Sequence, residues 1–137
     1  MKLETAALTV AIRSDPRYLP WLRAVLVALR RGLRPRASSS HLWRAGLVLT
    51  EAINNAIAHA HGRDMRRWIE VRIRFHARRC TLTVIDTGRA FGLPRRAVMP
   101  GPEQCQGRGL PLIQQWCRQC RVVRRARKNY FTMVCHV

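Results

Sequence analysis

Alternating apolar and polar residues mark several stretches of the chain as β-strands. The pattern is clearest in residues 68–76 (WIEVRIRFH) and 79–86 (RCTLTVID). Residues 7–13 (ALTVAIR) follow the same period, and two terminal strands are expected at about 120–126 and 130–137. Successive side chains of a strand point to opposite faces, so each stretch can bury one face and expose the other.

Apolar residues at helical spacing predict two helices between the first and second strands. The first begins after Ser14-Asp15-Pro16, where a capping residue precedes a proline suited to a first helical turn, and it stops at Gly32. The second runs from about 41 to 61, and Ser39 or Ser40 can cap it. The apolar stripe of the first helix consists of Leu19, Leu22, Val25, Leu26 and Leu29.

Residues 87–108 are expected to form a long loop, because they contain four glycines and three prolines. Long loops in compact domains are usually functional or mobile. A short third helix is predicted at 109–118, directly after this loop. The last two strands follow it and are expected to be joined near Lys128-Asn129.

The order of these elements predicts an α/β fold. Strand pairs joined by short turns should be antiparallel, which gives a two-layer α/β sandwich with a mixed, mainly antiparallel sheet and helices on one face. The 137 residues fit a single domain, 1–137. No apolar run approaches the roughly 20 residues of a membrane-spanning helix, and the first residues lack a signal peptide's apolar region. We therefore expect a cytoplasmic protein that does not contact a membrane.

The chain is strongly basic, with 26 Lys and Arg against 7 Asp and Glu and a net charge of +19. This balance favours anionic partners, whether nucleotide, nucleic acid or acidic protein. The arginines are spread along the chain without a basic block, which indicates a generally basic surface rather than a dedicated nucleic-acid-binding arm. The charge alone leaves the partner open.

The five cysteines do not form a disulfide framework. Cys117 and Cys120 have the C-x-x-C spacing of a redox pair or of half a zinc site, with Cys105 as a third candidate ligand. No second C-x-x-C or H-x-x-x-H motif completes a set of four ligands. The pattern therefore favours two thiols on a helix and its exit, packed as small hydrophobic side chains.

Candidate chemistry begins with one polar stripe on the second helix. Glu51, Asn55 and His59 are each four residues apart and so share a helix face. A carboxylate and an amide oxygen one turn apart suit a hard cation such as Mg²⁺, and the carboxylate can equally act as a base beside that metal. Most polar stripes simply face solvent, so this segment alone decides nothing.

Two further segments complete a nucleotide-binding pattern. Asp86 ends an apolar strand and is followed by a turn at Gly88, where a carboxylate can accept a hydrogen bond from an exocyclic amine such as that of adenine. Gly107 and Gly109 directly precede the third helix, and glycines at a helix N-terminus let the backbone approach phosphates. Each segment has an ordinary structural explanation, but their order along the chain is specific.

Three sequence boxes resemble those of the GHKL (Bergerat-fold) ATPases, and among them the anti-sigma-factor serine kinases. EAINNAIAHA (51–60) resembles the N box, DTGRAF (86–91) the first glycine box, and GRGLPLI (107–113) the second. Ala90 stands where many relatives have glycine, and Pro111 lies within the second glycine box.

The resemblance implies a role for each matching residue. Glu51 would be the catalytic base, Asn55 the Mg²⁺ ligand and Asp86 the partner of the adenine amine, with residues 94–106 as a lid over ATP. His59 also matches the N box, with a structural role equally open. The residues implied in binding ATP and Mg²⁺ are Asn55, Asp86, Gly88, Gly107, Arg108, Gly109 and Leu110.

The resemblance also implies the biological role. Relatives of this kind hold a sigma factor inactive and phosphorylate a serine on a small antagonist protein, so we expect serine/threonine-protein kinase activity and a sigma factor or antagonist as partner. A homodimer, formed through the first strand, is implied as well. The alternatives are an ATP-binding regulator without kinase activity and a basic nucleic-acid-binding protein. The scarcity of lysine and the lack of a recognisable motif predict only non-specific binding to nucleic acid.

Overall fold

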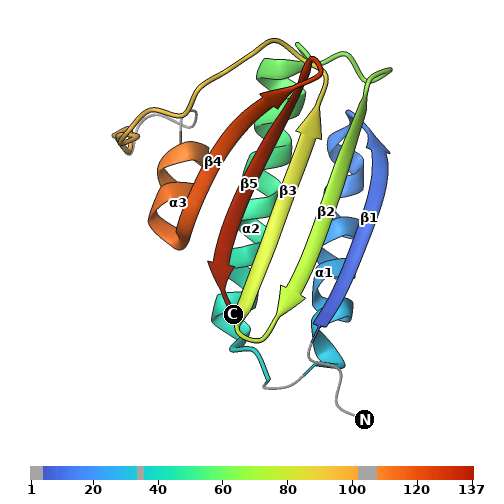
Figure 1. Cartoon of the computed structure of the whole chain (residues 1–137), viewed down its shortest axis with the longest axis vertical. Coiled ribbons are helices and arrows are strands. Elements are labelled where there is room, and N and C mark those ends of the chain that lie inside the picture. Colours follow the sequence, from blue (N-terminus) through green and yellow to red (C-terminus); the bar gives the residue numbers. More distant parts are fainter. Residues whose placement is uncertain (1–4, 34–35, 102–107) are drawn as a thin grey trace.

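The computed structural model describes residues 5–33, 36–101 and 108–137. Within them, one five-stranded sheet runs in the order β1-β2-β3-β5-β4 (Figure 1), and every neighbouring pair is antiparallel. The strands are β1 (Thr5–Arg13), β2 (Trp68–His76), β3 (Arg79–Asp86), β4 (Cys117–Arg125) and β5 (Lys128–His136). The α/β fold expected from the sequence is confirmed, and the sheet is more regular than the mixed sheet we expected.

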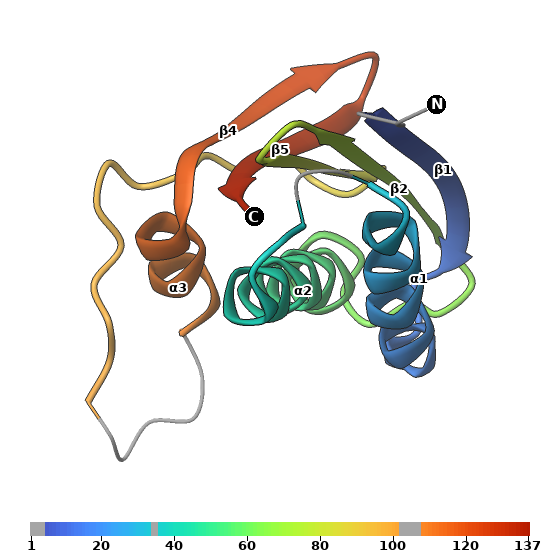
Figure 2. The same ribbon diagram turned by 90° about the horizontal axis from the view of Figure 1, so that it is seen from below.

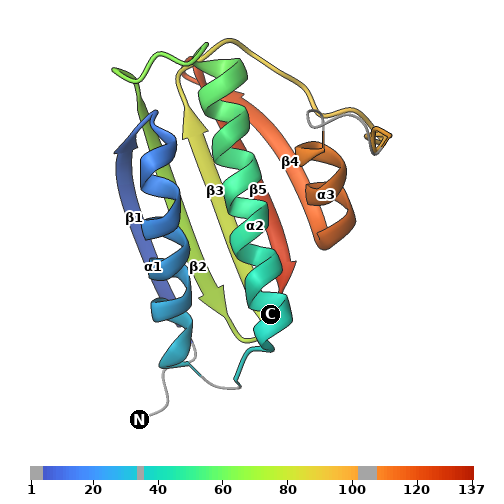
Figure 3. The ribbon, with the colours of Figure 1, turned by 180° about the vertical axis from the view of Figure 1, so that it is seen from behind.

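The described helices all cover one face of the sheet (Figure 2). They are the 3₁₀-helix η1 (Pro16–Tyr18), α1 (Leu19–Arg31), α2 (Ser39–Asn55), the π-helix η2 (Ala56–Ala60) and α3 (Gly109–Trp116). Helix α2 lies along the middle of the sheet, with α1 and α3 on either side of it (Figure 3). None of them is long and apolar enough to cross a membrane.

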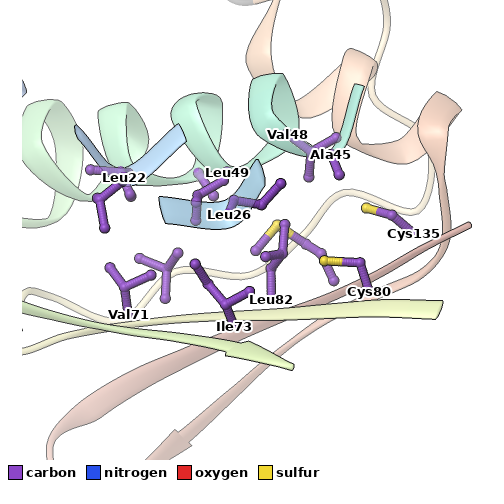
Figure 4. Close-up of a cluster of buried hydrophobic side chains, with 14 of the residues drawn as sticks. Leu22, Leu26, Ala45, Val48, Leu49, Val71, Ile73, Cys80, Leu82 and Cys135 are labelled. Carbon is purple, nitrogen blue, oxygen red and sulfur yellow. The ribbon is translucent and has the colours of Figure 1, made fainter. Parts of the chain in front are cut away.

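The core fills the space between the helices and the inner face of the sheet (Figure 4). Every second residue of β2 and β3 is buried there, as the alternation of their sequences requires. Burying a leucine or isoleucine fully contributes about 1.5–3 kcal/mol to the free energy of folding. Side chains at the centre of this core include Leu22, Leu26, Val48, Leu49, Val71, Ile73 and Leu82.

Side-chain caps explain where η1 and α2 begin. Asp15 accepts a hydrogen bond from the Arg17 backbone N–H at 2.9 Å, which confirms the predicted cap before Pro16. The predicted cap of α2 is wrong, because Ser38 caps it through the His41 N–H instead of Ser39 or Ser40. All three serines have the required hydroxyl, and Ser38 is the one held in an extended backbone conformation.

The C-terminal part of the chain departs furthest from the sequence-based boundaries. Helix α3 ends at Trp116 rather than 118, and β4 begins at the next residue without a connecting loop. The turn between β4 and β5 is Ala126-Arg127, not Lys128-Asn129 as predicted. Both turn residues have positive φ (49° and 62°), the backbone of the tight turns that match the twist of a hairpin.

Candidate functional site

The polar stripe of α2 faces a cavity beside α3. Glu51, Asn55 and His59 line this cavity, which has a volume of about 760 Å³, and Gly109 and Leu110 of α3 form part of its opposite wall. We call it the α2–α3 cavity. His59 belongs to the π-helix at the end of α2 and is exposed. Single π-helical turns often occur at functional sites.

Glu51 is half-buried at the wall of this cavity. Burial raises the pKa of its carboxyl group above the usual value, because the charged form loses solvation. A carboxylate with a raised pKa accepts a proton more readily near neutral pH than an ordinary surface glutamate does. The position of Glu51 therefore suits a general base.

Asn55 brings a buried polar atom to the same cavity. Its Nδ2 is buried and has no hydrogen-bond partner in the described parts of the chain. About nine in ten buried polar groups in proteins are hydrogen-bonded, so a group without a partner calls for a bound ligand or water. The amide also carries Oδ1, an oxygen ligand of the kind that Mg²⁺ takes. The residues present therefore fit a Mg²⁺–nucleotide complex.

The N-terminus of α3 comes directly against the acid and the amide. A Cβ atom added to Gly109 would lie 2.8 Å from Glu51 Oε2 and 3.7 Å from Asn55 Nδ2, so a larger residue here would displace the end of the Glu51 side chain. The first backbone bond at the start of the helix runs from the Leu112 N–H to the Arg108 oxygen. The N–H groups of Gly109 and Leu110 precede it, lack an acceptor within the helix and lie at its positive dipole end. Such a terminus attracts anions.

Asp86 is fixed beneath the cavity by a hydrogen-bond network. Its Oδ1 accepts from the Gly88 N–H and from Asn129 Nδ2, both at 2.9 Å. Asn129 also donates to the Arg89 oxygen and accepts from Arg124, whose guanidinium donates to the Gly88 oxygen. Both bonds to Asp86 fall on Oδ1, so Oδ2 receives neither of them. The sequence did not reveal Asn129, which looked like a turn residue.

Gly88 is required by packing. A Cβ atom at this position would lie 2.2 Å from the backbone oxygen of Ala60, which is far inside any normal contact. Ala60 in turn lines the α2–α3 cavity, so this contact joins the end of β3 to the cavity wall. Asp86 and Gly88 do not themselves belong to the lining, although they lie directly behind it.

A second polar group that the sequence did not single out stabilises the same corner. His61 is buried, and its Nδ1 lies 3.1 Å from Ser14 Oγ, while its Nε2 accepts from the Thr87 N–H. Burial lowers the pKa of His61, so the neutral ring is favoured. The imidazole thus ties the first loop of the chain to the turn after β3.

The described part of the predicted lid packs against the other side of α3. Gln114 accepts a hydrogen bond from the Ala97 N–H at 2.6 Å and donates to the Pro94 oxygen at 2.8 Å. Arg108 donates to the Gly101 oxygen. Residues 93–99, α3 and the start of β4 enclose a second cavity of about 990 Å³, which we call the loop cavity. Gly107 and the lid residues 102–106 lie outside the described residues.

The C-x-x-C cysteines lie elsewhere than we expected. Both Cys117 and Cys120 belong to β4, not to a helix and its exit, because β4 pairs with β5 from Cys117 onward. The Cys117 sulfur lies 3.5 Å from that of Cys135. Within residues 5–33, 36–101 and 108–137, no group of three or more His, Cys, Asp or Glu side chains could hold a metal ion. Cys105 is outside the described residues.

Comparison with known proteins places this architecture in a family. The family model described as a histidine kinase-like ATPase domain matches residues 12–135. A crystal structure of the RsbU and RsbW domains of Rv1364c from Mycobacterium tuberculosis is similar in fold, with a TM-score of 0.65 and 16% sequence identity. The similarity covers 96% of this chain and 32% of that one, so the chain spans about a third of its length. Among curated proteins, none matches the chain in sequence.

Proposed function

Because the chain belongs to the family of histidine kinase-like ATPase domains, we propose that it binds ATP with Mg²⁺ in the α2–α3 cavity and transfers a phosphoryl group to a serine or threonine of a partner protein. One observation carries this proposal above the others. Glu51 and Asn55 face the N-terminus of α3 at Gly109, so closely that a Cβ atom there would displace the end of the Glu51 side chain. An acid, an amide and free helix N–H groups thereby converge on one cavity.

Each residue has a task that follows from its surroundings. Asn55 would hold Mg²⁺, which neutralises charge on the phosphates when it is bound. The N–H groups of Gly109 and Leu110 would bind phosphate oxygens, and Arg108 lies beside them. Glu51 would accept the proton of the attacking hydroxyl, which its raised pKa favours.

Asp86 would recognise the adenine base. Gly88 and Asn129 hold its carboxylate through Oδ1, which fixes the orientation of the group. Oδ2 is then available to accept a hydrogen bond from an exocyclic amine. The buried network restricts this carboxylate to one position before the ligand arrives, which lowers the entropy cost of binding.

The partner proposed is a sigma factor or an antagonist of an anti-sigma factor. Similarity in fold to a structure that contains an RsbW domain supports this class of partner, and the net charge of +19 supports an acidic contact face. We also propose a homodimer through β1, which is an edge strand of the sheet and so has backbone groups free for pairing. Binding to nucleic acid would remain non-specific and would weaken steeply with salt.

The deciding experiment combines calorimetry with phosphoryl transfer from labelled ATP to candidate antagonist proteins. Glu51→Gln should lower transfer by about 10²–10⁴-fold while ATP affinity stays nearly unchanged, because a base acts mainly in the transition state. Wild-type transfer should decline as the pH falls through the raised pKa of Glu51, since only the carboxylate accepts a proton. Asn55→Ala should remove the Mg²⁺-dependent part of ATP binding.

The control for Glu51→Gln is Glu70→Gln, which removes an exposed carboxylate paired with Arg72 on β2. It should leave transfer and ATP affinity unchanged. ATP binding without transfer to any partner would favour the regulator without kinase activity. No ATP binding at millimolar concentration would overturn the nucleotide assignment, and full transfer by Glu51→Gln would show that Glu51 is not the base.

A further inference from the structure

Two thiols meet where β4 begins. The Cys117 and Cys135 sulfurs are 3.5 Å apart, and the two residues are opposite each other in the antiparallel register of β4 and β5. Opposed residues of this kind have Cα atoms about 4.5–5.5 Å apart, within the range that a disulfide spans. A register shift between Cys117 and Gln119 interrupts the regular ladder beside the pair.

The neighbouring thiols are placed less favourably. Cys120, the other member of the C-x-x-C sequence, is opposite Met133, so the strand pairing separates it from a partner thiol. Cys80 is opposite Cys135 from the β3 side, but it is fully buried in the core (Figure 4). The geometry therefore selects Cys135 as the partner of Cys117, which the C-x-x-C spacing did not suggest.

One sulfur of the pair is accessible. Cys117 is only half-buried and lines the loop cavity, whereas Cys135 is 2% exposed and lies behind it. A hydrogen bond between the two sulfurs lowers the pKa of Cys135 and, together with burial, raises that of Cys117. The first proton therefore leaves Cys135. Transfer of the Cys117 proton to Cys135 across the 3.5 Å contact then places the negative charge on the accessible sulfur, where an oxidant can reach it.

We propose that Cys117 and Cys135 are a redox modification site that forms a reversible disulfide with hydrogen peroxide as oxidant. The Cys117 thiolate attacks a peroxide oxygen, the O–O bond breaks, and the leaving hydroxide takes up one proton to form water. Cys117 is now a sulfenic acid. The Cys135 sulfur gives up its proton and attacks the Cys117 sulfur, the S–O bond breaks, and a second water leaves. Two thiols are oxidised and one hydrogen peroxide is reduced to two waters.

The bond would act on α3 as well as on the sheet. Cys117 is the C-cap residue of α3, so the disulfide fixes the end of this helix against β5. The opposite end of the same helix carries Gly109 and forms a wall of the α2–α3 cavity.

Peptide mapping tests the proposal on the full chain. Trypsin cuts after arginine and lysine and places the relevant thiols on separate peptides: Cys80 on 80–89, Cys117 on 109–118, Cys120 on 119–121 and Cys135 on 129–137. Protein treated with hydrogen peroxide, then alkylated and digested without reductant, should yield 109–118 linked to 129–137 with the loss of two hydrogens. Dithiothreitol should restore the separate peptides, and the oxidised protein should unfold at a higher temperature than the reduced one.

Cys117→Ser and its matched control Cys120→Ser both change a half-buried β4 thiol on the wall of the loop cavity. Cys117→Ser should lose the linked peptide and the rise in unfolding temperature, and Cys120→Ser should keep both. The wild-type map decides the matter even if a variant folds poorly. A dominant link from Cys117 to Cys120, from Cys80 to Cys135 or between two chains would overturn the proposal, as would oxidation to sulfinic acid without any link.

Discussion

The walls of the two cavities beside α3 differ in how tightly they pack. The α2–α3 cavity is backed by close backbone packing of Gly88 against Ala60 and by a buried hydrogen bond between Asp86 and Asn129. The loop cavity is bordered by residues 93–99, whose described hydrogen bonds to α3 run through Gln114. The walls of the two cavities therefore differ in how closely they are packed. Segments with few buried contacts open at a lower free energy than the core does.

The largest effect should come from filling the contact behind the first cavity. Gly88→Ala would place a methyl group against the backbone oxygen of Ala60, which cannot rotate away. We expect a loss of about 2–3 kcal/mol in the free energy of unfolding, measured by urea denaturation. Gly92→Ala is the matched control, since its added Cβ would meet nothing within 4 Å, and it should change stability by less than about 0.5 kcal/mol. Equal effects of the two substitutions would show that the contact between Gly88 and Ala60 can adjust to a methyl group.

A smaller effect is expected from changing the fixed carboxylate. Asp86→Asn presents an amide nitrogen where the carboxylate only accepts, so the new side chain cannot satisfy Gly88, Asn129 and an adenine amine together. We expect ATP affinity to fall about tenfold or more, which corresponds to about 1.4 kcal/mol, as measured by calorimetry. Asp64→Asn, at an exposed carboxylate paired with Arg66, should bind ATP like the wild type. Unchanged binding by Asp86→Asn would remove Asp86 from the site.

The smallest effect should come from releasing residues 93–99. Gln114→Ala removes two hydrogen bonds to the Ala97 N–H and the Pro94 oxygen, both at a partly exposed site. Stability should fall by about 1 kcal/mol or less, while amide hydrogen exchange at Ala97 becomes faster. Gln115→Ala, at an exposed position on the same helix, should leave this exchange unchanged. If Gln114→Ala protected the segment or destabilised the whole protein, the contrast between the two cavities would fail.

The fold could be predicted from the sequence wherever the two faces of an element differ in polarity and so produce a regular pattern of apolar and polar residues. Strands β2 and β3 were placed at their observed bounds, because buried residues alternate with more exposed ones along nearly all of their length. The end of α3 was not, because Trp116 and Cys117 follow Leu112 and Ile113 at helical spacing and suit a strand equally well. Only pairing with β5 decides between them, and that contact is distant in sequence.

The candidate site was predictable to a similar degree. Glu51, Asn55 and Gly109 were found from their spacing and from the resemblance, and the structure brings all three to one cavity. Asn129 escaped notice because Lys128-Asn129 looks like a turn, and its role depends on the register that places it opposite Asp86. The partnership of Cys117 with Cys135 depends on register in the same way.

The direct junction between α3 and β4 has a mechanical consequence. Since no residue separates Trp116 from Cys117, the helix and the edge strand have no slack between them. Any displacement of α3 along its axis must either shear β4 past β5 or break the first backbone bonds of that pair. The helix and strand are therefore mechanically coupled, and a displacement of the first turn of α3 is transmitted to the edge strand β4.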